Sequence, residues 1–180
     1  MKRALFTSFL LLSLAAFATT IRPMTVEQMT ASATHVIEGQ AVDKWVAWDS
    51  QHREILTYTR FNVLKTLKGS VGKQVLVAQL GGTLDGLTLR VAGIRHFDVG
   101  ETTLLFLRPG DTPAAMSLDT MQGNFRVQKD ATGDMVASNG LPDMSVLHGS
   151  QITTYTGNTV SLGVLETRIR QAATNKAVTK

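Results

Sequence analysis

Two tryptophans, a tyrosine and an arginine have the types and spacing of a binding surface. Trp45 and Trp48 lie three apart in a segment that reads as a strand, and Tyr58 and Arg60 lie in the next such segment. Because successive residues of a strand face opposite sides, the two tryptophans are expected on opposite faces. Either both are buried at a bend of the sheet, or at least one is exposed beside Tyr58. In the second case these four residues form an aromatic patch suited to a protein, a peptide or a glycan.

The four histidines offer little catalytic chemistry. His35, His52, His96 and His148 are scattered along the chain, and none has the spacing of a metal-binding pair. His96 with Asp98 is the best catalytic pair available, because a carboxylate can orient an imidazole. No G-x-S-x-G nucleophile motif accompanies them. No catalytic residue is therefore assigned, and a small hydrolase using His96 and Asp98 remains an alternative.

Cofactor and metal chemistry is not expected either. The chain has no cysteine, which excludes disulfides, thiolate metal sites and thiol catalysis. Copper-binding methionines usually stand two or three apart, whereas the closest pairs in this chain are five apart and are expected to fill the core.

The chain opens with the pattern of a cleavable secretory signal. Lys2 and Arg3 precede an apolar stretch over residues 4–15, and Ala16-Phe17-Ala18 has the form of a cleavage site. The apolar stretch is too short for a comfortable bilayer span, which needs about 20 residues. The pattern predicts a signal peptide over residues 1–18, a single domain over residues 19–176 and a flexible tail over residues 177–180, with no membrane anchor after cleavage. An exported domain without disulfides suits the bacterial periplasm or secretion from a bacterium.

The charge gives no sign of a nucleic-acid partner. The formal net charge is +4, but Lys2 and Arg3 belong to the signal and the other basic residues are spread along the chain. Such a distribution does not form the basic patch that binds nucleic acid.

Hydrophobic periodicity predicts a mainly β domain with a helix near each end. Thr25 and Gln28 form a capping-box pair that begins the first helix, and Asp85-Gly86 is a hairpin signal. The predicted helices cover residues 25–33 and 162–173, and the predicted strands cover residues 35–48, 55–67, 74–80, 87–91, 102–107, 125–128 and 135–138. Short strands separated by turns at this spacing favour a barrel or a sandwich.

The alternation of side chains also predicts the core. Residues 102–107 are apolar on both faces, which is typical of a central strand. The predicted core residues are Ile37, Phe61, Val63, Val77, Leu105 and Leu107.

The order of the segments resembles a known fold. A helix leads into "ATHVIEGQAVDKW", followed by "ILTYTRFNVLKTLKG", "VLVAQL" and "GETTLLFLRP". This order resembles the OB-fold-like barrel of the netrin module and the tissue inhibitors of metalloproteinases. The resemblance covers roughly residues 25–108 and implies a small OB-like antiparallel β-barrel with a binding role. The cysteines of that family are absent, so its inhibitory residues are not carried over.

These observations favour an exported, non-enzymatic binding module of the bacterial envelope with a protein partner. The resemblance extends this to a module that accompanies or restrains an exported protease. A carbohydrate- or peptidoglycan-binding domain that uses Trp45 or Trp48 is the alternative within the class of binding proteins.

The signal-peptide prediction can be tested directly. We expect the exported protein to begin at Thr19, because the apolar stretch is short and is followed by the cleavage motif. N-terminal sequencing of exported material measures this. Full-length protein in the membrane fraction would contradict it.

Overall fold

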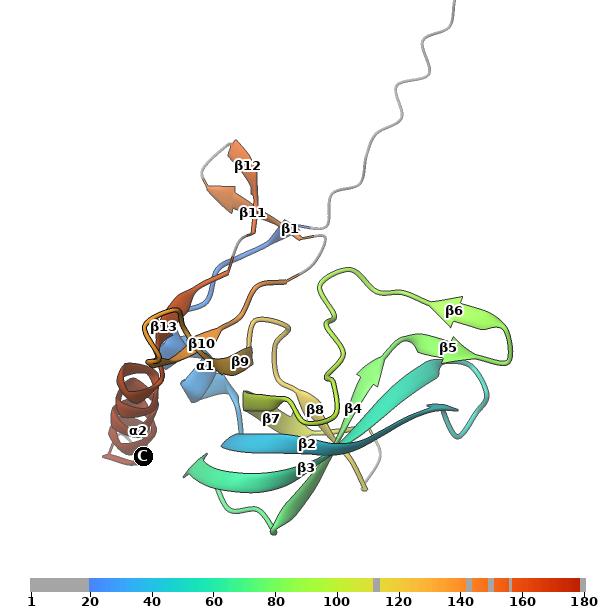
Figure 1. Ribbon diagram of the computed structural model, residues 1–180, viewed down its shortest axis with the longest axis horizontal. Helices are drawn as coiled ribbons and strands as arrows, with labels where there is room; N and C mark the ends of the chain where they lie inside the picture. Colours follow the sequence, from blue (N-terminus) through green and yellow to red (C-terminus); the bar gives the residue numbers. More distant parts are fainter. Residues whose placement is uncertain (1–19, 112–113, 142–143, 149–150, 156, 179–180) are drawn as a thin grey trace, which may run out of the picture.

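The computed structural model describes residues 20–111, 114–141, 144–148, 151–155 and 157–178, and the predicted signal peptide lies outside them. Two helices, α1 (Val26–Ser32) and α2 (Leu162–Val178), lie close together on one side of a β-rich body (Figure 1). The strands are β1 (Thr20–Ile21), β2 (His35–Trp48), β3 (Ile55–Lys68), β4 (Gln74–Leu80), β5 (Gly82–Leu84), β6 (Leu87–Leu89), β7 (Thr102–Pro109), β8 (Met116–Leu118), β9 (Asn124–Lys129), β10 (Met135–Ser138), β11 (Ser145–His148), β12 (Gln151–Thr154) and β13 (Thr159–Ser161).

The main sheet contains eight of these strands in the order β13-β10-β9-β7-β2-β3-β4-β8. Strand β8 is the last strand in this order. It pairs with its neighbour β4 and also with β7, which lies in the middle of the order. The β4–β8 pair is parallel, through Val77 and Met116. The sheet is therefore mixed, and the expectation of an entirely antiparallel sheet is wrong at this pair. Two smaller sheets, β5-β6 and β1-β11-β12, have no ladder pairing with it, although β5 lies against β2 and β3.

Local sequence signals place most elements correctly. Thr25 caps α1, and the Thr25 hydroxyl and the Gln28 side chain each accept a hydrogen bond from the other residue's backbone N–H. Strand β6 forms a hairpin with β5 across Asp85-Gly86, as the hairpin signal predicted, and it ends at Leu89 rather than at the predicted residue 91. Helix α2 continues to Val178, so its predicted end at residue 173 is wrong.

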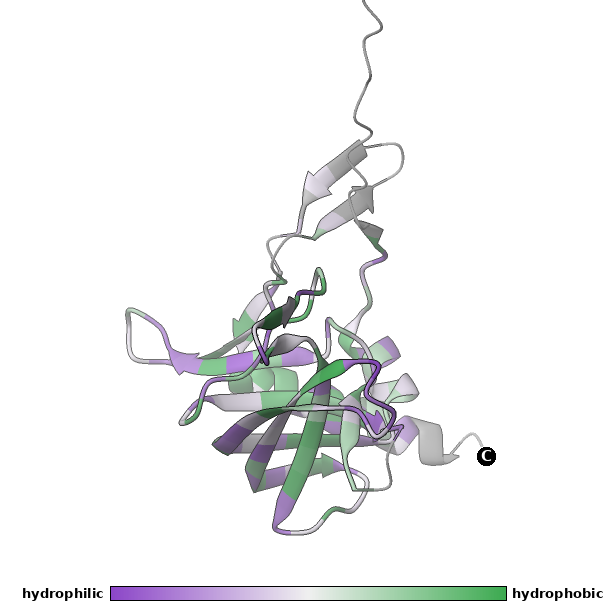
Figure 2. Cartoon of the chain, turned by 90° about the vertical axis from the view of Figure 1, so that its right-hand side faces the viewer, coloured by the Kyte–Doolittle hydropathy of each residue, from purple (hydrophilic) through white to green (hydrophobic). Residues whose placement is uncertain are grey.

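Strand β7 is buried on both faces, as its sequence predicted. Leu104 and Phe106 belong to a first core under the helices, which also contains Met29, Leu165 and Ile169. The opposite face of β7 points into a second core, which contains five of the six predicted core residues as fully buried side chains: Ile37, Phe61, Val77, Leu105 and Leu107. The sixth, Val63, is partly buried against them. Figure 2 shows hydrophobic and hydrophilic residues alternating along the strands of the main sheet.

Charged side chains hold α2 against the strands and α1. Lys65 of β3 lies 2.9 Å from Glu38 of β2 and 2.7 Å from Glu166 of α2. These contacts raise the pKa of Lys65, chiefly through its hydrogen bond with Glu166. Arg168 of α2 contacts the Glu27 carboxylate of α1 through two 2.9 Å hydrogen bonds.

The second core makes a direct stability prediction. Phe61 has no exposed surface and meets Phe97 edge-on, with ring centroids 4.9 Å apart. We expect Phe61→Ala to lower the free energy of unfolding by about 3–5 kcal/mol, because it leaves a cavity that the sheet cannot close. Leu64→Ala on the same strand is the control, since Leu64 is 52% exposed and its truncation should change stability by about 0.5 kcal/mol or less. Chemical denaturation measures both, and a loss below about 1 kcal/mol for Phe61→Ala would contradict the assignment of this face.

Candidate functional site

Three of the four predicted site residues come together on the outer face of β2 and β3. Trp45 is the cross-strand partner of Tyr58, and the two rings stack with centroids 5.5 Å apart at an interplanar angle of 12°. The Arg60 guanidinium carbon lies 5.5 Å from the centroid of the Trp45 ring. Arg60 is exposed, and Trp45 and Tyr58 are partly exposed. We call Trp45, Tyr58 and Arg60 the aromatic patch.

The fourth predicted residue, Trp48, lies on the opposite face. Its indole N–H donates a 3.0 Å hydrogen bond to the Asp85 carboxylate in the β5–β6 turn, and its ring stacks on His52 in the β2–β3 turn. The expectation that Trp45 and Trp48 face opposite sides is confirmed. Trp48 therefore joins two turns of the chain and does not contribute to the aromatic patch.

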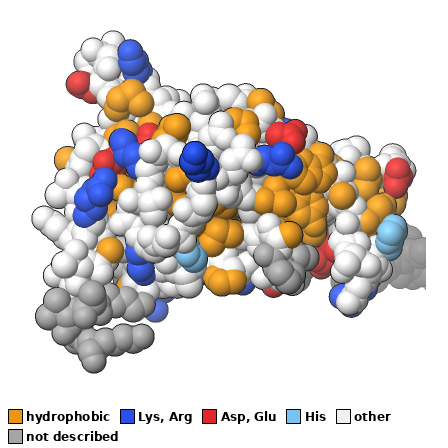
Figure 3. Space-filling model, turned by 90° about the horizontal axis from the view of Figure 1, so that it is seen from below, with side chains coloured by type: hydrophobic (Ala, Val, Ile, Leu, Met, Phe, Trp, Pro, Cys, Tyr) orange, Lys and Arg blue, Asp and Glu red, His pale blue; other side chains and the backbone are white. Residues whose placement is uncertain are grey.

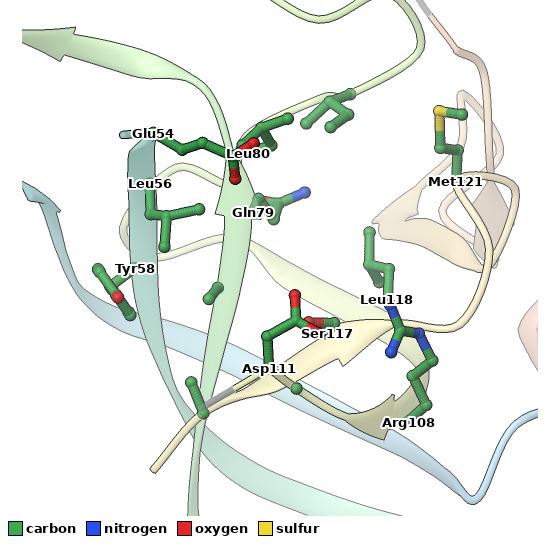
Figure 4. Close-up of a pocket in the computed structure, with 14 residues that line it drawn as sticks. Glu54, Leu56, Tyr58, Gln79, Leu80, Arg108, Asp111, Ser117, Leu118 and Met121 are labelled. Carbon is green, nitrogen blue, oxygen red and sulfur yellow. The ribbon is translucent and has the colours of Figure 1, made fainter. Parts of the chain in front are cut away.

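A cavity of about 270 Å³ begins beside Tyr58, between β3, β4 and the segment around β8. In Figure 4, Leu56 and Tyr58 approach it from β3, while Ser117 and Leu118 approach from β8. Its lining is mostly apolar, with Glu54, Arg108 and Asp111 as its charged side chains. Figure 3 shows hydrophobic side chains gathered on the face seen from below, with basic side chains next to them. Tyr58 belongs both to the aromatic patch and to the cavity lining, so the cavity adjoins the patch and extends from β3 to β4.

The segment between β6 and β7 forms one wall of this cavity through Ile94. It is anchored by a buried charge, because the Glu101 carboxylate accepts hydrogen bonds from Arg95 at 2.6 Å, Thr103 at 2.9 Å and Arg126 at 3.1 Å. Arg95 also donates to the Asn124 side chain, and Phe97 inserts into the second core. The sequence pattern did not reveal this network, because its members come from β7, β9 and a segment without regular structure.

The pKa of Glu101 reflects two opposing effects. Burial of the carboxyl favours its neutral form and raises the pKa. The charge of Arg95 and the hydrogen bonds from Arg95, Thr103 and Arg126 favour the carboxylate and outweigh burial, so the pKa lies below its usual range. The carboxylate is thus the stable form of Glu101 in the folded protein near neutral pH.

The alternative catalytic pair is not assembled. The His96 Nε2 atom donates a 3.1 Å hydrogen bond to the carbonyl oxygen of Leu80. Asp98 instead lies 3.4 Å from Lys44 and 4.0 Å from Arg126, and it makes no hydrogen bond with His96. A carboxylate that does not contact the imidazole cannot orient it as a general base.

Metal ligands and membrane-spanning helices can be assessed only for the part of the chain that the structure describes. Within it, no group of three or more histidine or acidic side chains could hold a metal ion. No helix in the same described ranges has the length and apolar character needed to cross a membrane.

No protein-family model matches the chain, and no curated protein matches it.

The Glu101 network predicts how stability depends on pH. The folded-state pKa of Glu101 is depressed, so its contribution is present above the unfolded pKa of about 4.3 and is lost as the pH falls through the folded value. We expect Glu101→Gln to lower the free energy of unfolding at pH 7 by about 3 kcal/mol, because Arg95 loses its charged partner. The difference between wild type and variant should shrink below pH 4.

Denaturation at pH 7 and pH 3 measures this difference. Asp130→Asn is the comparison for an exposed carboxylate. The pKa of Asp130 is also lowered, chiefly by its hydrogen bond with Thr132, so its effect should also shrink at pH 3, but it should be the smaller of the two because no partly buried arginine loses a partner. A Glu101→Gln effect of equal size at both pH values would show that the network acts through packing and not through charge.

Proposed function

We propose that this chain is an exported, non-enzymatic binding module of the bacterial envelope that binds a protein through the aromatic patch and the neighbouring cavity. The observation that carries the proposal is the stack of Trp45, Tyr58 and the Arg60 guanidinium on an outer strand face. Tryptophan, tyrosine and arginine are the residues most enriched among the dominant contacts of protein interfaces. An apolar cavity beside such residues offers a pocket for a side chain of the partner.

The proposed scaffold is an OB-like barrel. It is supported by the pairing of β7 with β2, β2 with β3, β3 with β4, β4 with β8, and β8 again with β7. OB-folds are five-stranded, partly open barrels that bind ligands on the face of their second and third strands and on adjacent loops. In that numbering the second and third strands are β3 and β4, which carry Tyr58 and much of the cavity lining. The fold alone does not select the ligand.

The contacts of Trp45 favour a protein over a glycan. A sugar ring stacks on the open face of an indole, and the Trp45 ring is already engaged by both Tyr58 and Arg60. The cavity is mostly apolar, whereas a sugar presents hydroxyl groups that need hydrogen-bonding partners. The narrower proposal, that the partner is an exported protease, is supported by the resemblance to the metalloproteinase inhibitors alone.

Affinity capture from an envelope extract tests the proposal. We expect the protein to retain a specific partner and the double variant Trp45→Ala/Arg60→Ala to lose it, since each such anchor contributes about 2 kcal/mol to binding. The melting temperature of the variant should change little, because both residues lie on an outer face. Met135→Ala is the control, because Met135 is 42% exposed and lies on β10, away from the patch.

Two results would count against this function. Retention of the partner by the double variant would exclude the patch as the binding site. Hydrolysis of ester, peptide or glycan substrates that disappears in His96→Ala would favour the enzyme alternative.

A further inference from the structure

One half of β2 is an edge strand. Strand β7 pairs with β2 only from His35 to Gln40, and Ala41 then exchanges backbone hydrogen bonds with Gly100 and Glu101. Strand β2 continues to Trp48 and pairs with β3 on its other side. In the described part of the chain, no strand pairs with residues 43–48 on the side that β7 has left. An edge of this kind can pair with another chain.

The direction of the backbone groups follows from the turn that closes the hairpin. Asp49 donates its N–H to the carbonyl oxygen of Glu54, so the backbone of Asp49 points toward β3. Backbone groups alternate along a strand, and the register is regular from Asp43 to Trp48. The N–H and C=O groups of Lys44, Val46 and Trp48 therefore point away from β3. Among the described residues they have no backbone partner.

The side chains at this edge define what an added strand would carry. The outward-facing residues are Asp43, Trp45 and Ala47, which alternate with the residues whose backbone is free. Asp43 is exposed and lies opposite Arg60 in the register, but Arg60 turns toward the Trp45 ring and forms no ion pair with Asp43. A neighbouring strand would place one side chain beside Trp45 and another, two residues away, beside the unpaired Asp43. Aromatic or β-branched residues and opposite charges are the favourable cross-strand partners at such positions.

We propose that the outer half of β2, residues 43–48, binds its partner by strand addition. The partner is an extended peptide segment that carries an aromatic or β-branched residue beside Trp45 and a lysine or arginine two positions away beside Asp43. The hydrogen bonds form between the peptide backbone and the free groups of Lys44, Val46 and Trp48, while the two side chains give specificity. This inference rests on the proposed protein-binding function and adds the mode of binding and the chemistry of the partner.

A displayed peptide library tests the specificity. The probes are peptides in which threonine alternates with randomised positions, so that they favour extended structure. We expect the protein to enrich aromatic or β-branched residues at one randomised position and lysine or arginine at the next. Asp43→Lys should switch the second preference to aspartate or glutamate, whereas the control Asp134→Lys, in the exposed turn between β9 and β10, should leave it unchanged.

Backbone measurements test the strand addition itself. With a selected peptide bound, amide hydrogen exchange should slow at Lys44, Val46 and Trp48 and change little at Asp43, Trp45 and Ala47. Val46→Pro removes one edge donor and should weaken binding by about tenfold or more, while Val46→Ala, which keeps the N–H, should retain it. If Val46→Pro does not fold, the exchange pattern of the wild-type protein decides the question.

The inference and the proposed function fail separately. The absence of enrichment, enrichment unaffected by Asp43→Lys, or bound peptide that leaves the exchange of Lys44, Val46 and Trp48 unchanged would each overturn the strand-addition mode. The protein-binding function would still hold if capture of the envelope partner depends on Trp45 and Arg60. Retention of the envelope partner by Trp45→Ala/Arg60→Ala would exclude the aromatic patch as its binding site and would leave strand addition to be decided by the peptide and exchange experiments.

Discussion

The burial of β7 on both faces is the constraint that organises the molecule. Leu104 and Phe106 complete the core beneath the helices, while Leu105 and Leu107 complete the core that contains Phe61. Every residue from 103 to 107 is buried. A polar substitution of an apolar residue on either face would therefore bury a polar group away from water, which lowers stability unless the group finds a hydrogen-bonding partner. Because β7 also pairs with β2, β8 and β9, its position fixes the strands that carry the aromatic patch and the cavity.

Charged side chains at the borders of the two cores hold neighbouring segments of the chain in place. Glu101 gathers Arg95 and Arg126 next to the second core and so fixes the long segment that contains Ile94 and Phe97. Lys65 lies between Glu38 and Glu166 and connects the sheet to α2. Pairs of this kind stabilise less than apolar packing does, but removal of one member leaves a partly buried charge without a partner. The cavity therefore depends on a salt-bridge network that does not itself line it.

Much of this arrangement was predictable from local sequence patterns. Strict alternation along residues 55–63 and the doubly apolar run at 102–107 identified the second core, and the three-residue separation of Trp45 and Trp48 placed them on opposite faces. The cavity was not predictable, because it needs β8, a strand of three residues with no periodic signal, to lie beside β4 in parallel. The Glu101 network was missed for a similar reason, since its members are distant in sequence and only the tertiary fold brings them together. The edge of β2 was also hidden, because a sequence does not show where a neighbouring strand turns away.

The contact between the two helices also bears on the order in which the chain folds. Arg168 and Glu27 are 141 positions apart, and the core beneath the helices needs residues from both α1 and α2. That core therefore stays open until α2 has been synthesised. Closing so long a loop is slow compared with forming local hairpins. A chain that completes one of its cores last exposes apolar surface for longer while it folds, and such surface favours aggregation.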